Sequence, residues 1–136
     1  MDLYKAMAAS SAGMKAQGTR IKVVAENIAN ANTTAETPGD LPYRRKVVTF
    51  QNEMDRQLGM DTVKVKKIDV DKSDFERRYD PTHPSADADG YVLMPNVNTL
   101  VESMDMREAQ RSYEANLTVV ESTRTMLSRT IEILRA

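Results

Sequence analysis

The 136-residue chain contains no cysteine and no tryptophan, and only 5% of its residues are aromatic. The absence of cysteine excludes disulfide bonds, thiolate catalysis and cysteine-based zinc sites, although it does not fix the cellular compartment. Aromatic side chains usually dominate the burial in a core. Because phenylalanine occurs only at Phe50 and Phe75, the sequence predicts a thin core. Nine methionines partly compensate, since methionine packs adaptably.

Long apolar runs are also missing. No run of about 18 apolar residues is present, so the sequence predicts no membrane-spanning helix and no direct membrane insertion. Residues 1–20 lack a continuous apolar segment and do not form a cleavable secretory signal. By these rules the protein is cytoplasmic unless another export route carries it.

Charge of either sign is not in excess, because 19 lysines and arginines nearly balance 20 acidic residues, for a net charge of -1. No overall field therefore attracts nucleic acid or an anionic membrane. Two basic clusters, at residues 44–46 and 64–67, could contact phosphate. Their acidic neighbours and the lack of interleaved aromatic residues favour surface solvation or subunit ion pairs instead.

Catalytic and metal-binding patterns are weak. The single histidine, His83, lies between Pro81-Thr82 and Pro84, which is typical of a turn. The acidic segment 69–89 opens like a calcium loop, but Asp74 and Asp80 stand where an EF-hand needs glycine and glutamate. We therefore predict no catalytic residue, no metal site and no cofactor. An enzyme or metal-binding module centred on His83 and these acids remains the alternative.

What the chain does have is a pair of similar ends, residues 3–31 and 98–135, with apolar residues at helical, near-heptad spacing. The first line of apolar residues is Leu3, Met7, Met14, Ile21, Val24, Ile28 and Ala31. The second line is Leu100, Met106, Tyr113, Leu117, Val120, Leu127, Ile131 and Leu134. Helices of these lengths would extend about 42 Å and about 57 Å, so they must pack on each other or on other chains. Asn96 or Asn98 can cap the second helix.

The middle of the chain has a different pattern. Strand-like sequences occupy residues 43–50 and 63–68, and a short apolar run follows the Asp89-Gly90 turn signal. Residues 51–58 are compatible with a helical turn or a bulged strand, and the polar segment 69–89 predicts a long loop.

These patterns predict a mainly α fold with a small β-rich insert, in which long N- and C-terminal helices pair as a coiled-coil-like α-domain. The predicted segments are an N-terminal helix in 1–34, the insert in 35–97 and a C-terminal helix in 98–136.

The most specific string is Asn27-Ile28-Ala29-Asn30-Ala31-Asn32-Thr33, which resembles the N-x-A-N-x-x-T signature of bacterial flagellar rod and hook proteins. Several further segments, in the same order, are similar to the proximal-rod members of that family. These segments are residues 79–84, 86–87, 90–92, 95–98, 104–106 and 108–117, while residues 41–45 resemble the segment that follows the signature in the family as a whole.

The resemblance implies a structural protein and not an enzyme: a subunit of the proximal rod of the bacterial flagellum that serves motility by transmitting torque from rotor to distal rod and hook. Its implied partners are other copies of itself, other proximal and distal rod proteins, the MS-ring of the rotor base, nearby export-gate components and the hook-basal-body complex, with no nucleic acid. The implied location is the basal-body rod, spanning the periplasm. The implied route is the flagellar type III export system, which uses an uncleaved signal.

Helical polymerisation through the terminal helices is the mechanism that follows, and its contacts must be heterologous. The predicted subunit-interface residues are Met7, Met14, Ile21, Ile28, Asn30, Leu117, Val120, Leu127, Ile131 and Leu134. Packing within the subunit is the alternative role for each of them. A soluble coiled-coil adaptor is the alternative function.

Overall fold

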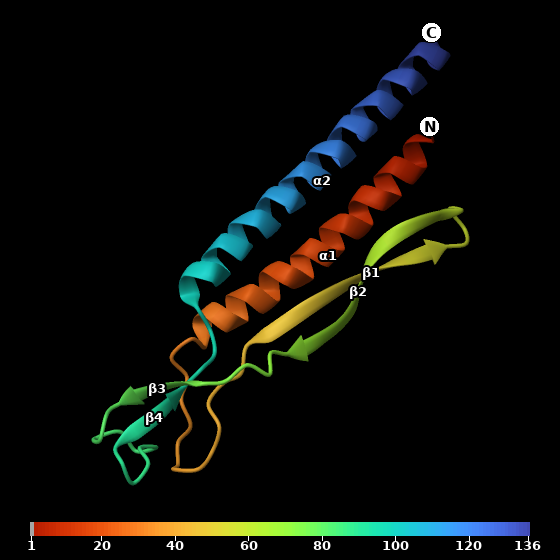
Figure 1. The fold of residues 1–136 in the computed structure, drawn as a ribbon. Coiled ribbons are helices and arrows are strands. Elements are labelled where there is room, and N and C mark those ends of the chain that lie inside the picture. Colours follow the sequence, from red (N-terminus) through yellow and green to blue (C-terminus); the bar gives the residue numbers. More distant parts are fainter. Residues whose placement is uncertain (1) are drawn as a thin grey trace. The chain divides into compact units, whose positions relative to one another are not determined.

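The computed structural model of the protein describes residues 2–136; Met1, the first residue of the predicted segment 1–34, lies outside the described residues. The described chain contains two helices and four strands, which Figure 1 shows in chain order. They are α1 (Leu3–Ala29), β1 (Lys46–Asp55), β2 (Met60–Val70), β3 (Glu76–Tyr79), β4 (Tyr91–Met94) and α2 (Thr99–Arg135).

Helix α1 has 27 residues, and hydrogen bonds made by polar residues mark both of its ends. At its start, the backbone N–H of Tyr4 donates to Oδ1 of Asp2 at 3.0 Å, which is an N-cap contact. At its end, Nδ2 of Asn30 donates to the Glu26 carbonyl at 2.8 Å, and the Thr33 N–H donates to the Asn30 carbonyl at 3.1 Å. The asparagine and threonine residues thus end the helix, as the sequence predicted.

Helix α2 runs for 37 residues, and Asn98 caps it. The Oδ1 of Asn98 accepts the backbone N–H groups of Leu100 at 3.1 Å and Val101 at 3.3 Å. From the sequence, either Asn96 or Asn98 could cap this helix. Asn96 has a different role, which is described below.

The four strands form two separate two-stranded sheets, β1–β2 and β3–β4. Residues 56–59 join β1 to β2, and Gly59 adopts φ +64° while its N–H donates to the Asp55 carbonyl at 2.8 Å. In the second sheet the strands are antiparallel, with Glu76 opposite Met94 and Tyr79 opposite Tyr91.

The predicted fold class is wrong, because the chain is not mainly α with a small β insert. Helices make up 47% of the residues and strands 21%, in two sheets. Residues 51–55 continue β1, where a helical turn or bulged strand was expected. Residues 76–79, inside the predicted loop, form β3. The helices are terminal, as predicted.

The chain divides into two compact units, each built from separate segments. The first contains residues up to 21, 48–67 and 107–136, and its buried side chains are small: Ser10, Ala16, Thr62, Ala109 and Thr123. The second contains residues 22–47 and 68–106, and buries Val23, Val24, Asn27, Ala31, Val92, Met94 and Glu102. The core is therefore thin, as the composition predicted. Among the described residues, none of the helices has the length and apolar character that crossing a membrane requires.

Candidate assembly interface

In the first unit, the two terminal helices lie side by side and antiparallel (Figure 1). Gly13 of α1 lies directly against Asn116 of α2, since a Cβ added to this glycine would be 2.9 Å from the asparagine Nδ2. Seven residues further along α1, Nη2 of Arg20 lies 3.6 Å from Oε2 of Glu108, eight residues earlier in α2. Leu3 lies ten residues before Gly13, and Met126 lies ten residues after Asn116. Because the helices are antiparallel, the same pairing brings Leu3 to the neighbourhood of Met126.

Helix α2 continues past the start of α1 (Figure 1). The buried Ala109 and Thr123 mark the side of α2 that packs inward, and Val120 on the same side is half-buried. Beyond residue 126, that side carries Leu127, Ile131 and Leu134, with exposed fractions of 43%, 48% and 80%. Among the described residues of the first unit, the last two turns of α2 therefore present apolar side chains that are covered only in part at Leu127 and Ile131 and very little at Leu134.

The remaining predicted interface residues lie in mixed surroundings. Those of α1, together with Asn30 just after it, are all half-buried: Met7, Met14, Ile21, Ile28 and Asn30. Leu117 of α2 is 37% exposed. Partial burial is what packing between the helices of one chain provides, and it leaves part of each side chain accessible. Their contact with another subunit stays a prediction.

A second apolar line on α2 was not predicted from the sequence. Val119, Met126 and Ile133 follow each other at intervals of seven and are 44%, 55% and 75% exposed. Each stands next to a residue of the predicted line, so the two lines merge into one broad apolar band in the sequence. The strict seven-residue interval was the signal that could have separated them.

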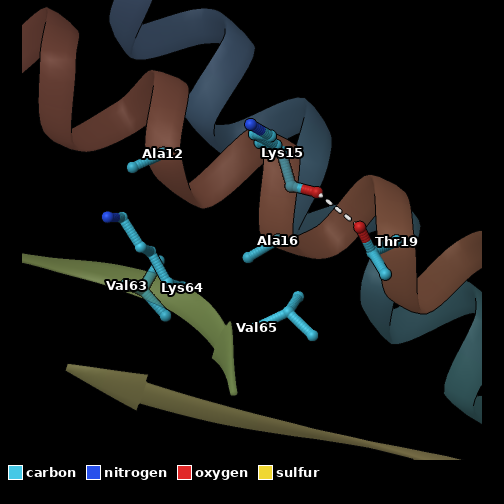
Figure 2. A pocket seen from close by; sticks show the side chains of 7 residues that line it. All are labelled: Ala12, Lys15, Ala16, Thr19, Val63, Lys64 and Val65. Atoms are coloured by element: carbon cyan, nitrogen blue, oxygen red, sulfur yellow. Dashed lines mark hydrogen bonds between the residues drawn. The ribbon is translucent and has the colours of Figure 1, made fainter. Parts of the chain in front are cut away.

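A groove lies between α1 and β2 in the first unit (Figure 2). Its volume is about 270 Å³, and it is lined by Ala12, Lys15, Ala16, Thr19, Val63, Lys64 and Val65. The alanines are too small to fill the space in front of the strand. In Figure 2, Val65 lies between the strand and the helix. Alanine and valine side chains make the walls of the groove mainly apolar, and Lys15 and Lys64 add positive charge.

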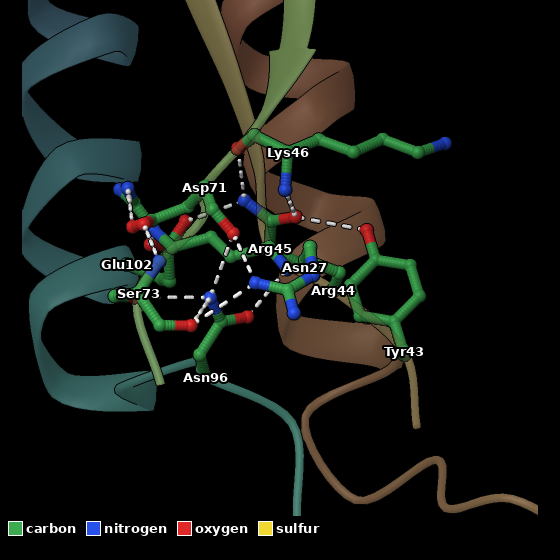
Figure 3. Close-up of polar contacts among 9 residues, drawn as sticks. All are labelled: Asn27, Tyr43, Arg44, Arg45, Lys46, Asp71, Ser73, Asn96 and Glu102. Carbon is green, nitrogen blue, oxygen red and sulfur yellow. Dashed lines mark hydrogen bonds and ion pairs between the residues drawn. The ribbon is translucent and has the colours of Figure 1, made fainter. Parts of the chain in front are cut away.

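The second unit contains a polar cluster around the fully buried carboxylate of Glu102 (Figure 3). One oxygen accepts from Nε of Arg45 at 2.5 Å, and the other accepts from Nδ2 of Asn27 at 3.1 Å. The Asn27 Oδ1 in turn accepts the Lys46 backbone N–H at 2.9 Å and the Tyr43 hydroxyl at 2.8 Å. A buried charge is tolerated because every oxygen has a partner.

Asn96 extends the cluster to the segment after β2. Its Oδ1 accepts the Arg45 backbone N–H at 2.8 Å, and its Nδ2 donates to the Asp71 carbonyl at 3.0 Å. Nη1 of Arg45 lies 3.5 Å from Oδ2 of Asp71. Burial acts to lower the pKa of Arg45, but Glu102 and then Asp71 raise it overall. The first asparagine of the signature string, Asn27, thus joins the start of β1 to Glu102 in the first turns of α2.

The basic cluster at residues 44–46 is used inside the chain. The guanidinium of Arg44 lies 4.2 Å from the centre of the Phe75 ring and donates to the Asp71 carbonyl at 2.9 Å. Nζ of Lys46 pairs with Glu26 at 2.9 Å, which lowers the pKa of that carboxyl. These contacts within the chain engage the side chains that phosphate binding would need.

His83 shapes a turn, as predicted. Its Nδ1 accepts the Ser85 backbone N–H at 3.1 Å, and its Nε2 lies 3.2 Å from the Thr34 hydroxyl. Within residues 2–136, no group of three or more histidine and acidic side chains is arranged to hold a metal ion.

Comparison with known proteins gives matches at both ends and along the whole chain. The family model described as "Flagella basal body rod protein" matches residues 7–35, and "Flagellar basal body rod FlgEFG protein C-terminal" matches residues 88–133. The flagellar basal-body rod protein FlgC of Agrobacterium fabrum is 54% identical over 127 residues, covering 93% of this chain and 91% of the relative. This chain belongs to the FlgC family of flagellar basal-body rod proteins.

Other FlgC proteins agree. That of Bacillus subtilis is 39% identical, with 98% of this chain and 99% of the relative covered. That of Salmonella typhimurium is 37% identical, with 91% and 92% covered. The chain is thus a structural subunit of the flagellar basal-body rod, which confirms the family resemblance and does not favour the adaptor or metal-module alternatives. It is located in the basal body and assembles with other rod and basal-body components.

Proposed function

We propose that this FlgC-family subunit polymerises through its terminal helices, and that the uncovered end of α2 is the main contact between subunits. The observation that carries the proposal is the apolar face of α2 beyond residue 126, where Leu127, Ile131 and Leu134 are 43%, 48% and 80% exposed. Full burial of one such side chain is worth about 1.5–3 kcal/mol, so covering several of them supplies a substantial part of an assembly energy.

The division of the chain supports the same proposal. The two family models match residues 7–35 and 88–133, which contain most of both helices, and leave the residues between them unmatched. We infer that segments 1–34 and 98–136 form the rod core and that segment 35–97 sets contacts with adjacent rod layers.

The position and route of the subunit belong to the same proposal. We place it in the proximal rod, which crosses the periplasm and transmits torque from the MS-ring rotor base to the distal rod and hook. Its neighbours there are further copies, other rod proteins and export-gate components. Passage through the flagellar type III apparatus suits a chain with no cysteine, because no disulfide can trap it.

Substitution of the uncovered face tests the proposal. Leu127→Asp and Ile131→Asp place a carboxylate on this face, and burial of an unpaired charge at an interface is costly. We expect either variant to fold like the wild type, since both side chains are substantially exposed in the chain, and to abolish rod assembly and swimming in a strain lacking its own copy. The matched control is Thr125→Asp, on the opposite, exposed side of α2. Swimming cells that carry Ile131→Asp, or equal loss with Thr125→Asp, would contradict the proposal.

A further inference from the structure

The two compact units of the chain carry opposite charge. In the first unit 12 basic residues outnumber 8 acidic ones, for a net charge of +4, and in the second unit 12 acidic residues outnumber 7 basic ones, for a net charge of -5. The total of -1 is therefore the sum of two strongly unequal parts. In a polymer of identical subunits, this division favours contacts between the first unit of one copy and the second unit of another.

The end of α2 provides a positive and apolar surface on the first unit. Four exposed residues follow each other there at intervals of three or four, so they lie on one side of the helix over about 17 Å: Arg124, Leu127, Ile131 and Arg135. Residues 124–136 contain a single acidic residue, Glu132, which directly follows Ile131 and thus lies about 100° round the helix. This side of α2 therefore has an arginine at each end and apolar side chains between them.

The outer face of the β3–β4 sheet provides an aromatic surface on the second unit. The strand register places four residues on this face: Arg77, Tyr79, Tyr91 and Leu93. Val92 and Met94 belong to the other face and are buried. On the outer face, Tyr79, Tyr91 and Leu93 are 64%, 39% and 36% exposed. The sheet thus uses one face for the core of the second unit and leaves an apolar face open.

Acidic residues surround the outer face. It borders a hollow of about 280 Å³ that residues of the segments 35–41 and 80–90 also line. These two segments contain no lysine or arginine and five acidic residues: Glu36, Asp40, Asp80, Asp87 and Asp89. Arg77 is neutralised, because its Nη2 lies 2.9 Å from Oδ2 of Asp87. Its guanidinium also lies 4.7 Å from the centre of the Tyr91 ring, which demonstrates that this face accommodates a guanidinium group.

We propose that the end of α2 of one copy of this chain docks on the outer face of the β3–β4 sheet of another copy. Leu127 and Ile131 cover the exposed tyrosine and leucine side chains, and the two arginines pair with the acidic segments on either side. This docking rests on the proposed function. It names the surface within segment 35–97 that receives the end of α2.

Such a contact agrees with an open polymer. The helix end and the sheet face are different surfaces of the same chain, so the contact is heterologous. Each added copy uses one of these surfaces and leaves the other one free. A self-complementary contact would instead close after two copies.

The absence of cysteine allows a direct test in isolated basal bodies. One chain carries Tyr79→Cys and a second carries Ile131→Cys, and the two are expressed together in cells that lack the wild-type copy. After oxidation, we expect mass spectrometry to find a disulfide that joins position 79 of one chain to position 131 of the other. The matched control is Arg78→Cys with Ile131→Cys, since Arg78 is exposed but lies on the other face of β3.

Charge exchange supplies the second arm. We expect Arg124→Glu with Arg135→Glu to reduce swimming several-fold, and Glu36→Lys with Asp89→Lys to do the same. A chain with all four changes should recover much of the swimming, and this recovery excludes misfolding as the cause of the loss. In the control, Asp74→Lys and Glu76→Lys replace the second pair of changes, because these exposed residues belong to the second unit but line neither the outer face nor its hollow.

The docking is overturned if the link from position 79 to position 131 is absent from basal bodies that contain both chains, or if Arg78→Cys gives the same yield. Equal recovery with the control pair would overturn it too, because net charge alone would then explain the effect. A link from position 131 to a different rod protein is a further contrary result. The proposed function survives each of these outcomes as long as Ile131→Asp still blocks assembly.

Discussion

At the scale of single residues, the most consequential contact is the one between Glu102 and Arg45. The carboxylate is fully buried, whereas the Arg45 side chain is 24% exposed. Removal of one partner of such a pair leaves a buried charge without compensation. We predict that Arg45→Met lowers the free energy of unfolding by about 2–3 kcal/mol, measured by urea denaturation.

The control for this prediction is Lys46→Met, because the Lys46–Glu26 pair is much more exposed, at 41% and 36%. Its loss should be much smaller. In addition, Arg45→Met combined with Glu102→Leu should recover part of the stability, since the buried charge is then gone. Equal losses for the two single variants would show that Glu102 is not the residue that matters.

Asp87 gives the second prediction at this scale, through pH. Its Oδ1 accepts the backbone N–H groups of Tyr91 at 2.9 Å and Asp89 at 3.0 Å, and Nη2 of Arg77 donates to Oδ2 at 2.9 Å. The Tyr91 hydrogen bond foremost lowers the pKa of this carboxyl below its ordinary value of 3.8. Because the folded-state pKa is the lower one, the stabilisation is complete above pH 3.8 and is lost as the pH falls through the folded-state pKa.

We therefore predict that Asp87→Asn is less stable than the wild type near neutral pH and that the difference shrinks below pH 3.8. Thermal unfolding of both proteins over a pH series measures this difference. A gap that stays constant down to about pH 2 would show that the charge of Asp87 contributes nothing.

At the scale of elements, Gly13 and Gly18 of α1 allow the effect of helix propensity on stability to be distinguished from the effect of packing. Each costs about 1 kcal/mol relative to alanine in a helix interior. Nothing lies within 4 Å of a Cβ added to Gly18, whereas at Gly13 the Cβ would be 2.9 Å from Nδ2 of Asn116. That Nδ2 also donates to the Ser112 carbonyl at 2.9 Å, so moving it sacrifices a hydrogen bond.

We predict that Gly18→Ala stabilises the protein by about 1 kcal/mol and that Gly13→Ala gains at least about 1 kcal/mol less. Urea denaturation compares the two. Adding Asn116→Ala to Gly13→Ala should remove most of the difference between them. Equal gains for the two single variants would mean that α1 and α2 do not approach closely at Gly13.

The elements also show what the sequence could predict. The helices followed from local signals: apolar residues at heptad spacing, the Asn98 cap and the polar string after Ile28. Strand β3 did not, because Glu76-Arg77-Arg78-Tyr79 has no apolar alternation and becomes a strand only through pairing with β4. The burial of Glu102 was equally hidden, since it depends on Asn27 and Arg45, which lie 75 and 57 positions away in the sequence.

At the scale of the whole molecule, the chain buries few apolar side chains and leaves many of them exposed. The buried residues of the first unit are small, and the apolar line of α2 continues beyond the start of α1 with side chains that stay exposed. Large exposed apolar surfaces mark interaction sites. In a structural subunit of the rod, we propose that another subunit covers this surface.

The measurement that tests this account most directly is photo-crosslinking in isolated basal bodies, from a photoreactive amino acid placed at Ile131. The account predicts adducts that join this subunit to a second rod subunit, with few such adducts from the same probe at Thr125. Intact basal bodies in which the probe at Ile131 forms adducts only within its own chain would contradict it.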